Sequence, residues 1–143
     1  VENLRFYGKL YKVPQLDEKI QVLLKRTGLT LFQDMPIRSF SRGMLQKLAI
    51  AKVLLTDPDL LLLDEPHTGL DQNAICLLNS LLAERKKNGA SILIISHDLE
   101  QVLSLADRAA VLRKGSIEET IELNGKIDLP TMKEWYLKAV ANQ

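Results

Sequence analysis

The sequence predicts an α/β domain with a parallel sheet, preceded by a separate helical lobe. Three amphipathic helical segments come first, before any strand. From residue 57 onward, short apolar strands alternate with helices, which is typical of parallel sheets with helical crossovers. We therefore expect a helical subdomain over residues 1–56 and the C-terminal part of an α/β core over residues 57–143.

The helical lobe is predicted from apolar spacing and from its end signals. Residues 1–12 and 17–27 carry apolar side chains at helical spacing. Ser41 is expected to N-cap a third helix that continues to about residue 55. Residues 30–38 are expected to be irregular.

Short apolar segments predict the strands of the core. Residues 60–63 and 91–95 are rich in Leu and Ile, which predicts strands buried on both faces. Residues 109–113 are expected to form a third strand, which turns into an extended segment over residues 116–121. The remaining elements are expected to be helices over residues 71–87, 98–106 and 132–141 and a turn at Asn124-Gly125.

Composition limits the classes of partner. Lys and Arg number 19 against 18 Asp and Glu, for a formal net charge of +1, so no strong field attracts nucleic acid. No apolar run is long enough to span a bilayer. The single cysteine, Cys76, is expected to be a buried helix residue, and it favours a reducing compartment because no internal disulfide can form.

Two adjacent carboxylates follow the first predicted strand. Asp64 and Glu65 would lie at the edge of the sheet where open α/β domains bind ligands. Asp64 suits Mg²⁺ held through water, because Mg²⁺ uses few carboxylates. Glu65 could polarise an attacking water in phosphoryl transfer. The simpler alternative is a solvated acidic turn.

Two further segments could contact a phosphate. His97 follows the second predicted strand, and its imidazole can donate a hydrogen bond to a phosphate oxygen. Ser41 and Gly43 lie at a helix N-terminus, whose N–H groups and dipole favour an anion. The alternatives are a surface histidine, the interpretation we adopt for His67, and ordinary N-capping by Ser41.

In their order and spacing, these segments resemble the ATP-binding subunits of ABC transporters over nearly the whole chain. The segments that carry the resemblance are Ser41-Arg42-Gly43-Met44 for the signature motif, residues 60–65 for the Walker B strand, Thr68-Gly69-Leu70-Asp71 for the D-loop and Ser96-His97-Asp98 for the H-loop. The signature departs from the usual pattern, because Arg42 replaces a glycine and Met44 a glutamine.

The resemblance implies a P-loop NTPase fold of the RecA-like type and a site for ATP with Mg²⁺ in the complete subunit. By it, Asp64 would serve Mg²⁺, Glu65 would be the general base, and His97 would contact the γ-phosphate. Ser41 and Gly43 would touch ATP bound on a second ATPase subunit. Asp71 would lie at that dimer interface.

The phosphate-binding loop itself is missing from the sequence. No G-x-x-x-x-G-K-[ST] pattern occurs among the seven glycines. The resemblance therefore implies the C-terminal portion of a subunit, inactive alone, whose missing strand would lie between the strand before His97 and residues 109–113. Because open strand edges recruit other chains, we expect possible self-association through that vacant position.

The complete subunit would power transport across a membrane. It would lie on the cytoplasmic face as a peripheral protein, bound to a transmembrane permease through the helical lobe. The signature style favours an exporter of the multidrug or haem type. The alternatives are a soluble ABC ATPase in DNA repair or translation, and a non-catalytic self-associating module.

Overall fold

The computed structural model describes residues 1–123, 125 and 127–141. It divides into two compact units, Val1–Ile94 and Ile95–Gln143. The turn predicted at Asn124-Gly125 involves a residue outside the described part of the chain.

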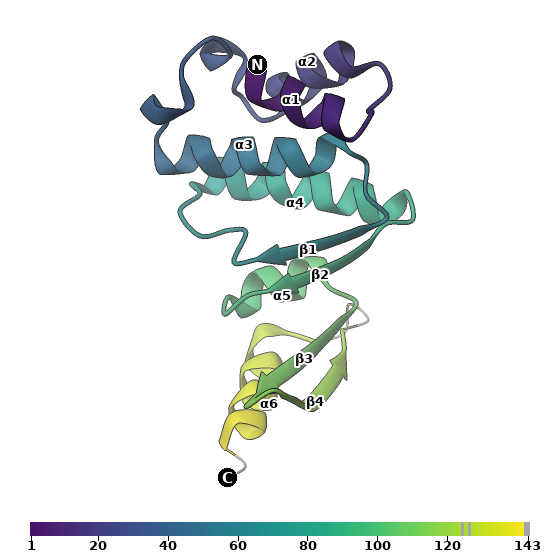
Figure 1. Cartoon of the computed structure of the whole chain (residues 1–143). Coiled ribbons are helices and arrows are strands. Elements are labelled where there is room, and N and C mark those ends of the chain that lie inside the picture. The colour runs from purple at the N-terminus through teal and green to yellow at the C-terminus, as the bar shows by residue number, and fades with distance from the viewer. Residues whose placement is uncertain (124, 126, 142–143) are drawn as a thin grey trace. The chain divides into compact units, whose positions relative to one another are not determined.

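The first unit opens with α1, α2 and α3, which confirms the three early helices predicted from the sequence (Figure 1). A separate helical subdomain that ends at residue 56 stays a prediction, because the first compact unit extends to Ile94. The side chains that pack between them include Leu4, Ile20 and Ala51, all fully buried. As predicted, Ser41 caps the third helix, because its Oγ accepts a hydrogen bond from the Met44 amide at 3.2 Å. The elements are α1 (Glu2–Leu10), α2 (Leu16–Arg26), the 3₁₀ turns η1 (Thr30–Phe32) and η2 (Ile37–Ser39), and α3 (Arg42–Leu55).

A strand–helix–strand segment completes the first unit. Strand β1 (Leu60–Asp64) pairs with β2 (Ser91–Ile95), and α4 (Gln72–Lys87) connects them. The chain enters both strands from the end where α4 finishes, so they run parallel (Figure 1). This is the helical crossover that the alternation of strands and helices predicts.

The prediction that both strands are buried on two faces is wrong. In β1, Leu61 is only 2% exposed, whereas its neighbour Leu62 is 68% exposed. Leu60 and Leu93 are more than half exposed as well. Alternate residues of a strand point to opposite faces, so the sheet has one packed face and one open apolar face. Cys76, expected to be buried, is also exposed.

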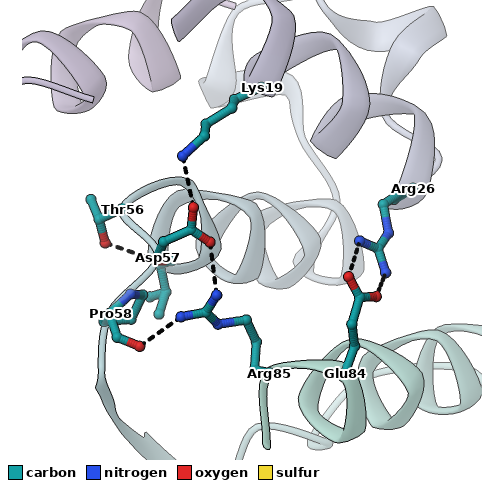
Figure 2. Close-up of polar contacts among 8 residues, drawn as sticks. Lys19, Arg26, Thr56, Asp57, Pro58, Glu84 and Arg85 are labelled. Carbon is teal, nitrogen blue, oxygen red and sulfur yellow. Dashed lines mark hydrogen bonds and ion pairs between the residues drawn. The ribbon is translucent and has the colours of Figure 1, made fainter. Parts of the chain in front are cut away.

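Asp57 joins α2, the turn after α3 and the end of α4. Its Oδ2 accepts from Lys19 Nζ at 2.7 Å, and its Oδ1 accepts from Arg85 Nη1 at 2.9 Å (Figure 2). Arg85 Nη2 also donates to the Pro58 carbonyl at 2.9 Å. Because the Arg85 side chain is only 18% exposed, its hydrogen bonds are poorly replaced by water.

A second ion pair fastens α2 to α4. Arg26 forms a fork with Glu84, in which Nη1 and Oε1 are 3.2 Å apart (Figure 2). The hydrogen bond from Arg26 holds the pKa of the Glu84 carboxyl below its ordinary value of 4.5. The pair therefore contributes stability above the ordinary pKa, and this contribution is lost as the pH falls through the lowered pKa.

We expect Arg85→Ala to lower the free energy of unfolding by about 1–3 kcal/mol, because it leaves Asp57 and the Pro58 carbonyl without their shared donor. Lys87→Ala is the matched control, since Lys87 is exposed in the same last turn of α4 and carries the same charge. Urea unfolding followed by circular dichroism measures both. Equal losses in the two variants would show that Arg85 acts only through its charge at the helix end.

The second unit is a hairpin with two helices. Strands β3 (Arg108–Arg113) and β4 (Ser116–Glu122) pair antiparallel, with an irregular register between Val111 and Leu112. Lys114 and Gly115 both have positive φ, which suits the tight turn between the strands. Helix α6 (Leu129–Ala141) packs on β3 and on α5 (Leu99–Leu105). Helix α6 begins earlier than predicted.

The strands fall into two separate two-stranded sheets, β1–β2 and β3–β4. The α/β class predicted from the sequence is confirmed. In the part of the chain that the structure describes, none of the helices combines the length and apolarity that crossing a bilayer requires.

Candidate functional site

The loop between β1 and α4 carries most of the predicted site residues. Glu65, its first residue, has a left-handed backbone with φ of 46°. Pro66 follows it and disfavours the ordinary helical conformation for the residue before it. Amide hydrogen bonds close two turns in the loop, from Thr68 to the Glu65 carbonyl and from Leu70 to the His67 carbonyl, both at 3.1 Å. Unusual backbone of this kind concentrates at functional sites.

The two acids differ in their surroundings. Asp64 is exposed at the carboxyl end of β1, whereas Glu65 is partly buried. No group of three His, Cys, Asp or Glu side chains among the described residues could hold a metal ion. Asp64 therefore fits only a metal that takes most of its ligands from water and phosphate, as Mg²⁺ does.

The start of α3 lies against this loop. A Cβ added to Gly43 would stand 3.6 Å from the Gly69 carbonyl oxygen. The structure thus brings the signature residues Ser41 and Gly43 beside the loop that begins at Glu65 and ends at Asp71. Ser41 Oγ caps α3, and a contact of Ser41 with a bound phosphate stays a prediction.

Asp71 is the last residue of the loop and the N-cap of α4. Its Oδ1 accepts a hydrogen bond from the Ala74 amide at 2.8 Å. Asp71 is exposed, so another molecule could reach it. Capping fixes the place where the loop ends.

His97 lies in the second unit. The imidazole is exposed in the segment after β2. Its neighbours order this segment, because Ser96 Oγ accepts from the Asp98 amide at 3.1 Å and Asp98 caps α5 by accepting from the Glu100 and Gln101 amides. A phosphate contact by His97 stays a prediction.

Sequence reasoning missed two residues that hold the loop. His67, expected at the surface, is only 8% exposed, and its Nε2 lies 2.8 Å from Asn79 Oδ1 on α4. Gln46 Nε2 on α3 donates to the Pro66 carbonyl at 2.9 Å. One feature of the sequence could have indicated the contact between His67 and Asn79. Asn79 is a polar residue directly after Leu78, which is buried in α4.

Comparisons with known proteins show which family this chain resembles in sequence and fold. The ABC transporter family model matches residues 1–68. The uncharacterized ABC transporter ATP-binding protein YybJ of Bacillus subtilis is 36% identical over 126 residues, which cover 88% of this chain and 57% of that protein. A solved ATP-binding subunit of an ABC transporter is 27% identical, with a TM-score of 0.87 over 97% of this chain and 61% of its own.

A dimeric bacterial ABC transporter cassette shares the fold, with a TM-score of 0.70 at 24% identity over 76% of this chain and 47% of its own. The chain belongs to the family of ABC transporter ATP-binding proteins. It spans 57% of the length of the relative named above, and the structure it resembles is likewise longer.

Proposed function

We propose that this chain supplies one part of the ATP-hydrolysing site in the ATP-binding subunit of an ABC transporter, which powers transport across a membrane. One observation carries the proposal: the start of α3, with Ser41 and Gly43, is packed against the loop that carries Glu65 and Asp71. The carboxylate proposed as catalytic and the helix end proposed to contact phosphate therefore lie in the same compact unit. Family membership supports this assignment.

The proposed roles follow the chemistry of each side chain. Glu65 orients and deprotonates the water that attacks the γ-phosphate, since a partly buried carboxylate is a suitable general base. Asp64 binds Mg²⁺ through water, and the ion would supply positive charge to the phosphates. His97 donates a hydrogen bond to the γ-phosphate.

Two partners are part of the proposal. Ser41, Gly43 and Asp71 face a second ATPase subunit, and the dimeric cassette with the same fold supports such pairing. A transmembrane permease docks on the helical lobe, residues 1–56, at the cytoplasmic face of the membrane. Apolar side chains on and just after α1 support this, because Phe6, Leu10 and Tyr11 are each more than 60% exposed.

A second candidate is a non-catalytic, self-associating module. The open face of the first unit favours it, because Leu60, Leu62 and Leu93 leave an apolar surface uncovered. In the leading proposal, the rest of the cassette covers that face. Sedimentation of the chain across a range of concentrations distinguishes association between copies from a stable monomer.

Calorimetric titration with MgATP tests the leading proposal. We expect no saturable binding by this chain alone, because it has no phosphate-binding loop, and saturable binding with hydrolysis by a complete subunit that includes one. Hydrolysis by the chain alone would contradict the proposed division of the site. A complete subunit that neither binds nor hydrolyses ATP would contradict the function itself.

A further inference from the structure

The residue that departs most from the signature pattern makes a specific contact. Arg42 is the first residue of α3, at the position where the resemblance expects a glycine. Its side chain crosses the backbone of Gly69 in the loop after β1. A Cβ added to Gly69 would stand 3.2 Å from Arg42 Nε and 3.5 Å from its Cδ. The stem of Arg42 therefore occupies the space beside the loop.

Three contacts from α3 meet the same short loop. Besides Arg42 on Gly69, Gly43 approaches the Gly69 carbonyl, and Gln46 donates to the Pro66 carbonyl. From the other side, His67 is held to α4 by Asn79. The loop is thus fixed between two helices, and its two ends are the catalytic and dimer-facing carboxylates of the proposed site.

We propose that Arg42 is a positioning residue that holds the start of α3 against the loop between β1 and α4. Glu65 and Asp71, at the two ends of this loop, then move together with the start of α3. This inference rests on the proposed function. Packing of the Arg42 stem supplies the contact, because Cγ, Cδ and Nε face Gly69. Arg42 makes no ion pair with any residue in the described ranges, so its charge is not needed for this contact.

Gly69 explains why the contact can form. Its φ of 79° lies in the left-handed region, which glycine adopts without a steric penalty. Because it has no side chain, the Arg42 stem can lie directly on its backbone. An arginine at the start of α3 and a glycine in the loop are therefore complementary, although they are 27 positions apart (69 minus 42).

Amide hydrogen exchange in this chain tests the contact without any need for ATP. We expect Arg42→Ala to speed exchange of the Thr68 and Leu70 amides about three- to tenfold, because the loop opens more readily. Arg42→Met, which keeps an unbranched stem, should stay within about twofold of the parent, as should the charge control Arg38→Ala. Unchanged exchange in Arg42→Ala would overturn the proposal.

Steady-state kinetics of the complete subunit test the catalytic consequence. We expect Arg42→Ala to lower kcat about three- to tenfold with little change in the KM for ATP, and Arg42→Met to restore kcat. If Arg42→Met is as impaired as Arg42→Ala while Arg42→Lys is active, the charge matters and the packing proposal is wrong. A parent subunit without ATPase activity would refute the proposed function instead, and hydrogen exchange would still decide whether the contact locks the loop.

Discussion

We expect Glu65→Gln in a complete subunit to lower kcat for ATP hydrolysis about 10²- to 10⁴-fold, the usual effect of removing a general base. The substitution keeps the size and shape of the side chain, but the amide cannot accept a proton from the attacking water. Glutamine can adopt the left-handed backbone of Glu65 as well as glutamate does, so we expect the conformation of the loop to be unchanged. Binding of MgATP should persist, because the interactions with the ground state are unchanged.

The measurement combines steady-state hydrolysis with calorimetric binding of MgATP. Glu118→Gln is the control, since Glu118 is an exposed residue of β4 and loses the same charge. We expect this control to match the parent in both assays. Hydrolysis by Glu65→Gln within about threefold of the parent would assign the two acids to a solvated turn rather than to a catalytic pair.

The elements of the first unit could be predicted because local signals agree there. The cap Ser41, the apolar spacing of the early helices and the Leu-rich run of β1 each point to the observed element. The position of Asp64 and Glu65 at the end of a strand could be predicted for the same reason, while their roles stay a prediction. Such local consistency is what makes an element predictable from sequence.

The contacts that fix the loop could not be predicted in the same way. Arg42 on Gly69 and His67 with Asn79 depend on how the helices pack, and no local spacing encodes those pairs. The exposure of Leu62 was missed for a related reason. An uninterrupted apolar strand indicates two buried faces, but whether a second layer covers it depends on other parts of the protein.

The packed and open faces of β1 differ in their expected response to mutation. We expect Leu61→Ala to lower the free energy of unfolding of this chain by about 2–5 kcal/mol, because Leu61 is 2% exposed and its loss leaves a cavity. Leu62→Ala, one residue along the same strand, should cost less than about 0.5 kcal/mol, because Leu62 is 68% exposed. Urea unfolding followed by circular dichroism measures both.

The same pair of variants tests whether the open face is covered in a complete subunit. If the rest of the cassette packs there, Leu62→Ala should become costly in the complete subunit, by about 2 kcal/mol or more, while the cost of Leu61→Ala stays similar. The comparison is internal, since both leucines belong to β1 and lose the same atoms. If Leu62→Ala still lowers the free energy of unfolding only slightly in the complete subunit, this face is open there too. Association between copies of the chain would then explain the exposed leucines better.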